Sequence, residues 1–213
     1  GRNTQVGNTL TVTVADTSTT PTENFSAEFD GNDDYLSMAT SSDLSFGTGD
    51  YTVECWVKPT SLSGNLEIVL NTGGYDDNTF YFHYRNNQLS VGNLNAYISN
   101  QATTFENGAW YHIAACRSGS TLKLFKNGTQ VGSDATDNTN WDSGGPILIG
   151  AQNGPVQRVN GKISNLRVVK GQAIYTSNFT PSSTALTTTS QGATSSNVKL
   201  LCCKTATLTD ADV

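Results

Sequence analysis

Residues 110–131, WYHIAACRSGSTLKLFKNGTQV, decide the fold, because they contain two strands together with the turns that join them. Side chains alternate up to Arg117, a Ser-Gly-Ser turn follows, and apolar residues return from Leu122. This pattern predicts a β-hairpin. Asn127 and Gly128 then supply two residues that tolerate positive φ, which lets a third strand begin immediately. The stretch therefore predicts an antiparallel meander.

The hairpin, with its W-x-H-x-A start and x-N-G-x-x-V end, resembles the central hairpin of laminin-G-like jelly rolls in the concanavalin A-like lectin/glucanase superfamily. The resemblance continues in further blocks: FDGNDDYL at 29–36, YTVECWVKP at 51–59, ILIG at 147–150 and NGKISNLRV at 160–168. The later pattern, over residues 167–181 and KLLCC at 199–203, looks most like versions of this domain in virion proteins of marine bacteriophages.

The resemblance implies an all-β chain, and no segment shows a sustained helical period that would contradict this. We expect a two-sheet antiparallel β-sandwich, a jelly roll of the concanavalin A-like type. Each sheet should hold about six or seven strands, and under about a tenth of the residues should be helical.

The domain organisation follows from the pattern of strands and linkers. Residues 1–24 hold a strand at Thr9–Val14 and a Thr/Ser-rich linker, residues 25–203 form the jelly roll, and residues 204–213 are a C-terminal tail. The first strand is either an outlying strand of this domain, the last strand of a preceding domain, or an edge strand given to a neighbouring subunit. The Gly-Arg start leaves open a processed product, part of a longer chain, or a cloning scar.

Composition narrows the class of protein. Of 213 residues, 36% are apolar and only 14% are charged, a make-up typical of extracellular or virion β proteins. The net charge of −6, with twelve scattered Lys and Arg residues, argues against a nucleic-acid partner. No apolar run reaches the roughly 18 residues of a membrane span, so no membrane insertion is expected.

The four cysteines are Cys55, Cys116, Cys202 and Cys203. In the pentraxin branch of the superfamily a disulfide joins positions that hold Glu54 and Ala114 here. Cys55 is one residue from Glu54 and faces the other side of its strand, whereas Cys116 faces the same side as Ala114, so the two thiols should not meet. The two adjacent cysteines should point to opposite faces, where a vicinal bridge is strained. We expect four free, mostly buried thiols.

No catalytic pattern is present. Glycosidases of this superfamily carry paired carboxylates at E-x-D-x-E spacing, because the acid and the nucleophile must lie about 5 Å apart. The five glutamates stand at positions 23, 28, 54, 67 and 106, and none lies within four residues of another. His83 and His112 have no Ser or Cys nucleophile in a recognisable pattern, and His112 matches a structural histidine of the family hairpin. We therefore expect no enzymatic activity.

Calcium needs separate consideration, because pentraxins bind it through an Asp-Asn loop and a second run of acidic or amide residues. Asp77 and Asn78 match the first half, but residues 151–154 supply amides without a carboxylate. A hard cation requires several charged oxygens, so no metal site is assigned and no cofactor is expected. Asp30, Asp33 and Asp34 leave a single structural calcium open, although a role as turn formers is favoured.

Three polar loops are the candidate binding regions: residues 71–78, 138–145 and 152–160. In the jelly rolls that this chain resembles, such loops gather at one end of the sandwich. Aromatic stacking faces would come from Tyr75 and Trp141, while Asp77, Asn78, Gln152 and Asn153 would supply hydrogen bonds to a sugar. A contact with a neighbouring subunit is the alternative for these loops. Trp56 is expected to pack under a neighbouring segment rather than to bind sugar.

The sequence is therefore interpreted as a non-enzymatic structural or adhesion module of a phage particle, in a fibre, spike or capsid decoration. It would lie on the virion surface or outside the cell and contact other virion proteins, copies of itself, or host surface glycans. The alternative is a secreted carbohydrate-binding lectin module of cellular origin.

Overall fold

The computed structural model describes residues 4–5, 12–14, 25–62, 66–74, 76–93, 95–142, 144–154 and 157–204. These residues form strands and three short 3₁₀ turns: η1 (Ser42–Leu44), η2 (Ser190–Gly192) and η3 (Ser195–Asn197). Within these ranges no helix is long and apolar enough to cross a membrane. The predicted all-β class is confirmed.

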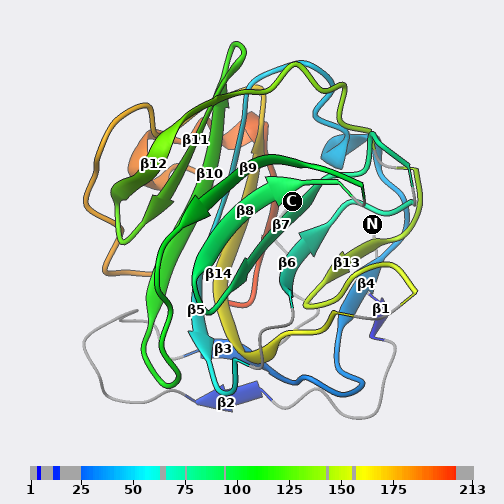
Figure 1. Cartoon of the computed structure of the whole chain (residues 1–213), viewed down its shortest axis with the longest axis vertical. Helices are drawn as coiled ribbons and strands as arrows, with labels where there is room; N and C mark the ends of the chain where they lie inside the picture. Colours follow the sequence, from blue (N-terminus) through cyan, green and yellow to red (C-terminus); the bar gives the residue numbers. More distant parts are fainter. Residues whose placement is uncertain are drawn as a thin grey trace.

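One layer is a seven-stranded antiparallel sheet, whose curved strands lie nearest the viewer in Figure 1. In spatial order it contains β1 (Thr4–Gln5), β4 (Leu36–Met38), β13 (Ile147–Ile149), β6 (Glu67–Asn71), β7 (Tyr81–Arg85), β8 (Gln88–Gly92) and β9 (Tyr97–Ala102).

The second layer is an eight-stranded sheet, one strand larger than the sequence predicted. Its order is β12 (Thr129–Thr136), β11 (Thr121–Lys126), β10 (Tyr111–Ser118), β5 (Tyr51–Pro59), β14 (Asn160–Lys170), β3 (Phe25–Asp30) and β2 (Val12–Val14). β15 (Val198–Cys202) also pairs with β14. One edge of the long strand β14 pairs with β5. Its other edge pairs with β3 in the first half of the strand and with β15 in the second half.

The predicted meander is confirmed in detail. β10 pairs with β11 and β11 pairs with β12, all antiparallel. Asn127 and Gly128 join β11 to β12 with φ of 51° and 76°, the left-handed conformation that this dipeptide tolerates. The N-terminal strand β2 pairs with β3, so it forms an outlying strand of this sheet; the rest of the predicted Thr9–Val14 strand lies outside the described residues.

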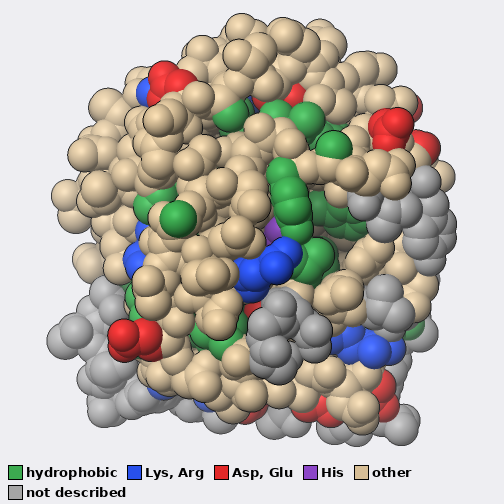
Figure 2. Space-filling model, in the orientation of Figure 1, with side chains coloured by type: hydrophobic (Ala, Val, Ile, Leu, Met, Phe, Trp, Pro, Cys, Tyr) green, Lys and Arg blue, Asp and Glu red, His purple; other side chains and the backbone are tan. Residues whose placement is uncertain are grey.

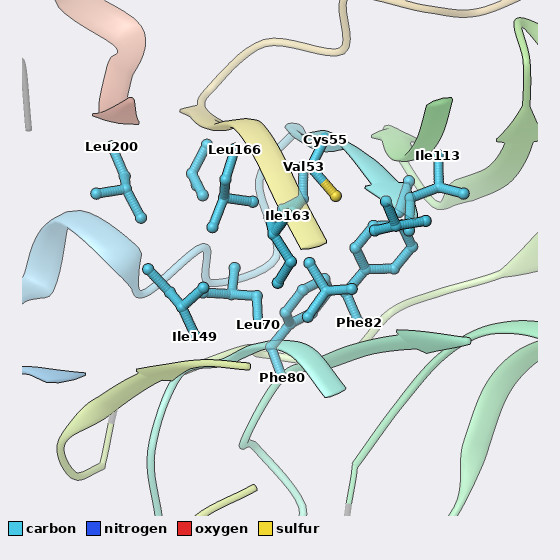
Figure 3. Close-up of a cluster of buried hydrophobic side chains, with 14 of the residues drawn as sticks. Val53, Cys55, Leu70, Phe80, Phe82, Ile113, Ile149, Ile163, Leu166 and Leu200 are labelled. Carbon is cyan, nitrogen blue, oxygen red and sulfur yellow. The ribbon is translucent and has the colours of Figure 1, made fainter. Parts of the chain in front are cut away.

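The core fills the space between the two sheets, as Figure 3 shows. Val53, Cys55 and Ile113 reach it from the eight-stranded sheet. Phe80 and Phe82 reach it from β7 and the residue before it. The alternate side chains of β5, which the sequence predicted to form an apolar face, therefore point into the core between the sheets. Trp56, on the other face of β5, is 6% exposed and packs against the His112 ring, so its expected burial is confirmed.

The outer face of the eight-stranded sheet is covered by residues 171–197, which we call the strap (orange in Figure 1). Tyr175 and Leu186 are its buried anchors, and the rings of Tyr175 and Phe179 stack with centroids 3.5 Å apart. The sequence predicted that residues 181–197 cross the surface. The strap begins ten residues earlier, and apolar side chains are buried between it and the outer face of the sheet.

The cysteines confirm one predicted register and correct another. Cys55 lies in the core between the sheets, whereas Cys116 lies on the outer side of β10 with Tyr175. Cys202 and Cys203 were expected on opposite faces, but both belong to the main core, and their sulfur atoms are 3.6 Å apart. The reason is that the strand ends at Cys202 and Cys203 adopts a left-handed φ of 60°, which turns its side chain back inward.

Candidate functional site

The strap covers the outer face of the eight-stranded sheet, whereas on the outer face of the seven-stranded sheet the ring of Tyr97 stays partly exposed. Along β7 the sequence YFHYR alternates, and Phe82 and Tyr84 enter the core. Tyr81, His83 and Arg85 therefore share the opposite, outer face of the strand. His83 is flanked in register by Ile68 on β6 and Ser90 on β8.

A hollow of about 150 Å³ lies on this face, and we call it the sheet pocket. Its described lining residues are Leu66, Ile68, Tyr81, His83, Asn93, Asn95, Ala96, Tyr97 and Gln152. Figure 2 shows this side of the molecule, with a histidine in a hollow between hydrophobic and basic side chains. This volume is several times that of one water molecule, so the hollow can admit a small ligand.

Tyr97 forms one wall of the sheet pocket. It is 45% exposed and is the only large hydrophobic side chain so exposed among the described residues. Its ring lies 5.5 Å from the His83 ring, centroid to centroid, and its phenol oxygen accepts a hydrogen bond from Arg85 Nη2 at 2.8 Å. The ring is therefore held in place with a face open to solvent.

His83 forms part of the floor. It is 3% exposed, and its Nδ1 has no hydrogen-bond partner within the described structure. Burial, together with the positive charge of Arg85, lowers the pKa of His83 to about 3. The imidazole is thus neutral at ordinary pH, when one ring nitrogen can donate and the other can accept.

The amide side chains at the loop end of the pocket are held by the loop before β7. Asn95 Nδ2 donates to Asp77 Oδ1 at 2.7 Å, and Asn93 Nδ2 donates to the Asp77 carbonyl at 2.8 Å. The Asn93 Oδ1 in turn accepts from the backbone N–H groups of residues 95 and 96. These bonds fix the amides that line the pocket.

The three predicted loops do meet. The Asp142 N–H donates to the Asn78 carbonyl at 2.9 Å, and Asn153 Nδ2 donates to the Gly74 carbonyl at 3.3 Å. Gly73 is required at the junction, because it has a φ of 83° and a Cβ there would lie 2.4 Å from the Gly145 main chain. Loop gathering at one end of the sandwich is therefore confirmed for these segments.

The predicted site residues have different fates. Gln152 lines the sheet pocket, and Asp77 supports it through Asn95. Asn78 is exposed beside Asp77, and Asn153 is tied to the backbone of residue 74. Tyr75 lies outside the described residues. The predicted hydrogen-bonding residues thus cluster near the pocket without forming its floor.

Trp141 cannot serve as the predicted stacking platform. Its side chain is fully buried, and its indole N–H donates to Asp137 Oδ2 at 2.8 Å. The ring packs edge-on against Phe80 in the core. The polar sequence of the loop predicted an exposed Trp141 side chain. The ring is instead buried, because its indole N–H binds the buried Asp137 carboxylate and its ring packs against Phe80.

The carboxylates of the acidic turn at residues 30–34 bind backbone N–H groups of the turn itself. Asp30 Oδ1 accepts hydrogen bonds from the N–H groups of Asn32 and Asp33, and Asp34 Oδ2 accepts one from the Asp30 N–H. Oxygen atoms of Asp30, Asp33 and Asp34 lie within 4.8 Å of one another. The backbone bonds account for this clustering, and a structural calcium stays an untested prediction.

Two other hollows offer weaker candidates. One lies beside the strap, with Cys116 and Tyr175 in its lining, and the other lies beside Asp30 and Phe29. The aromatic rings of both are buried, with Tyr175 4% and Phe29 1% exposed. Neither presents an aromatic face to a ligand, so the sheet pocket is the candidate site.

The sequence matches the family model Laminin_G_3, described as the concanavalin A-like lectin/glucanases superfamily, over residues 30–173. The chain belongs to this superfamily. No curated protein matches the sequence. The match includes the sheet pocket and ends at the start of the strap, so the pocket belongs to the part of this superfamily domain that the family model recognises.

Solved structures share the fold of this concanavalin A-like domain at low identity. Domain 4 of AbnA, an extracellular GH43 arabinanase from Geobacillus stearothermophilus solved with arabinotriose, has a TM-score of 0.55 and 18% identity, covering 80% of this chain and 83% of that one. The enzymatically active domain of bacteriophage CBA120 tailspike protein 2 has a TM-score of 0.59 and 12% identity. That match covers 81% of this chain but only 29% of the tailspike chain. Domains LG4-5 of the mouse laminin α1 chain have a TM-score of 0.50 and 16% identity, covering 72% of this chain and 44% of that one.

Sequence reasoning missed Tyr97, His83 and Arg85 as site residues. His83 was considered only as a catalytic base, and Tyr97 lies in a short strand between Asn-rich turns. The usable signal was the alternation in YFHYR, which places three polar-tipped side chains on the face opposite Phe82 and Tyr84.

Proposed function

We propose that this domain binds glycans without cleaving them, through the sheet pocket. The observation that carries the proposal is Tyr97, an exposed aromatic ring fixed by Arg85 beside a pocket of about 150 Å³ with both apolar and polar lining residues. An aromatic face packs against the C–H groups of a sugar ring, while nearby polar groups bind its hydroxyls.

The polar groups have suitable chemistry. Asn93, Asn95 and Gln152 offer amide donors and acceptors, and neutral His83 offers either role. Sugar hydroxyls both donate and accept, so such a mixed set can satisfy several of them at once. This arrangement supports binding of a hydroxyl-rich ligand.

A binding role is favoured over hydrolysis by the chemistry of the lining. Retaining and inverting glycosidases use two carboxylates that flank the scissile bond. The described residues that line the sheet pocket include neither Asp nor Glu.

We further propose that the domain is an adhesion or structural module of a phage particle, displayed on the virion surface beside other virion proteins or copies of itself. The low charge content, the phage-like pattern at residues 167–181 and a shared fold with part of a tailspike support this proposal. A secreted carbohydrate-binding lectin module is the second candidate, supported by the shared fold with domain 4 of an arabinanase solved with arabinotriose.

A glycan array followed by calorimetry on the best ligand tests binding. Tyr97→Ala should weaken affinity by about tenfold or more, because it removes the stacking face. Tyr35→Ala is the matched control, since it removes a half-buried aromatic ring from the turn after β3. An unchanged affinity of Tyr97→Ala would move the ligand away from the pocket, and no binding to any glycan would reject the proposal.

Electron microscopy of the source particle, with a labelled antibody against the domain, distinguishes the two origins. Label on intact particles supports the virion module. Protein found only free in the medium supports the secreted lectin.

A further inference from the structure

Arg85 is not among the described lining residues, but it places a positive charge beside the sheet pocket, next to the phenol of the lining residue Tyr97. It is the last residue of β7, on the same face as His83, and its Nη2 donates a hydrogen bond to the Tyr97 phenol at 2.8 Å. Within the described part of the chain, its buried Nε has no hydrogen-bond partner and its guanidinium forms no ion pair. The guanidinium is thus held in place by Tyr97, and its Nε–H group has no acceptor among the described residues.

The opposite end of the pocket is different. Asp77 lies in the loop that precedes β7, and its carboxylate is occupied by the Asn95 amide. From Tyr81 to Arg85 the strand spans about 13 Å. The described lining between them contains Asn, Gln, Tyr and neutral His but no charged side chain. The pocket therefore has an amide end, and Arg85 lies beyond the Tyr97 phenol on the other side, which we call the cationic end.

We infer that the sheet pocket selects a sugar unit bearing a carboxylate, which Arg85 receives at its cationic end; this rests on the glycan binding proposed above. A guanidinium offers a planar fork of N–H groups that matches a carboxylate. His83 lies two residues away on the same face and can donate a further hydrogen bond. Tyr97 packs against the sugar ring between these two groups, with its hydroxyl positioning the guanidinium.

The net charge of the whole chain does not favour acidic glycans, so a preference for them must come from Arg85. With a net charge of −6, the protein repels polyanions at long range. An acidic glycan therefore binds through a specific arrangement and not through a general basic surface. Binding should thus depend on Arg85 itself and much less on other basic residues.

The test measures affinity for oligogalacturonate, for its methyl ester and for the other carboxylated and neutral glycans of an array. The wild type should bind at least one carboxylated glycan about tenfold more tightly than its neutral methyl ester. Arg85→Gln should remove this preference while retaining weak binding to the ester, and Arg85→Lys should retain part of it. Lys123→Gln is the control, because it removes one positive charge from the other sheet, where Lys123 pairs with Asp134. Circular dichroism confirms that each variant is folded.

The outcomes separate the two proposals. Preference for a carboxylated glycan that Arg85→Gln abolishes and Lys123→Gln preserves supports the inference. Equal or better binding of neutral glycans, or a preference unaffected by Arg85→Gln, overturns the inference while leaving glycan binding intact. Absence of binding to every glycan overturns both. Equal binding to dextran sulfate and to carboxylated glycans would show a non-specific polyanion effect and also overturn the inference.

Discussion

Glu54 lies fully buried beside Arg167, whose Nε donates a hydrogen bond to the Glu54 Oε1 at 2.8 Å. The second carboxylate oxygen accepts from the Tyr175 hydroxyl at 2.8 Å and lies 3.1 Å from His112 Nε2. Arg167 also donates to the Thr187 and Ser190 carbonyls. The ion pair thereby joins β5 and β14 to both halves of the strap.

Replacing Glu54 should strongly destabilise the fold. Burial alone raises the pKa of Glu54, but the hydrogen bond from His112 and the charge of Arg167 outweigh it, so the pKa is lowered and the group is ionised. Glu54→Gln leaves the buried Arg167 charge uncompensated, at a cost of about 3–5 kcal/mol. Urea unfolding measures this. Glu28→Gln is the control, because the partly exposed Glu28 lies 3.9 Å from Lys162 and should cost under about 1 kcal/mol.

The fold could be predicted from sequence because its signals are local. The hairpin at residues 110–131 carries its own alternation and its own turn residues, and those set the register of the eight-stranded sheet. Cys55 and Cys116 were placed correctly for the same reason, since period two decides the face of a strand. The predicted face of Cys203 was wrong because the strand ends at Cys202, and alternation alone does not show where a strand ends.

The site could not be predicted as well, because it depends on which faces stay uncovered. Tyr97 and His83 lie on strands separated by β8 and meet only across the sheet. Whether an outer face is exposed depends on the path of the strap, which lies far along the chain. Trp141 was misplaced because its burial depends on Asp137 and Phe80, contacts that a polar loop sequence does not show.

Trp141 should therefore matter for stability and not for ligand binding. Trp141→Phe removes the indole N–H that binds Asp137 and leaves a cavity, which should cost about 2–4 kcal/mol. Glycan affinity of the folded fraction should stay within about twofold of the wild type. Thermal unfolding measures the loss of stability, and calorimetry measures the glycan affinity. A stable variant with lost affinity would return Trp141 to the binding site.

All four cysteines should titrate as thiols. They are buried, and burial raises the pKa of Cys55 and brings that of Cys116 to about 12, so reactive thiolates are suppressed in the folded state. Reaction with a thiol reagent should count four thiols under denaturing, non-reducing conditions and nearly none in the native protein. A denatured count of two would reveal a bridge, for which the adjacent Cys202 and Cys203 are the obvious pair.

Calcium should add little stability at the Asp30 turn. Its carboxylates already accept three backbone hydrogen bonds, so the turn is satisfied without an ion. Millimolar calcium or a chelator should leave the midpoint of thermal unfolding unchanged, whereas Asp30→Ala should lower it in both conditions. A rise of several degrees with calcium, lost in Asp30→Ala, would establish a structural ion instead.

Glu67 should make stability depend on pH near neutrality. Burial raises the pKa of Glu67 to about 7, although the Asn160 N–H donates to its carboxylate at 2.7 Å and opposes the shift. Between pH 4.5, the ordinary pKa of a glutamate, and about pH 7, the folded state therefore binds more protons at this site than the unfolded state does. Its contribution to stability is complete below pH 4.5 and is lost as pH rises through 7, by roughly 3 kcal/mol in all.

The Glu67→Gln variant isolates this effect, because glutamine can still accept the Asn160 hydrogen bond but does not titrate. His83 acts in the opposite sense below its ordinary pKa of 6.5, since its folded-state pKa is lowered to about 3 and the unfolded state takes up the proton first. Subtracting the urea-derived stability of Glu67→Gln from that of the wild type cancels the His83 contribution. The difference should fall between pH 5 and pH 8 by roughly 2–3 kcal/mol. A flat or rising difference would mean that Glu67 is ionised in the folded protein throughout this range, and that the Asn160 bond outweighs burial.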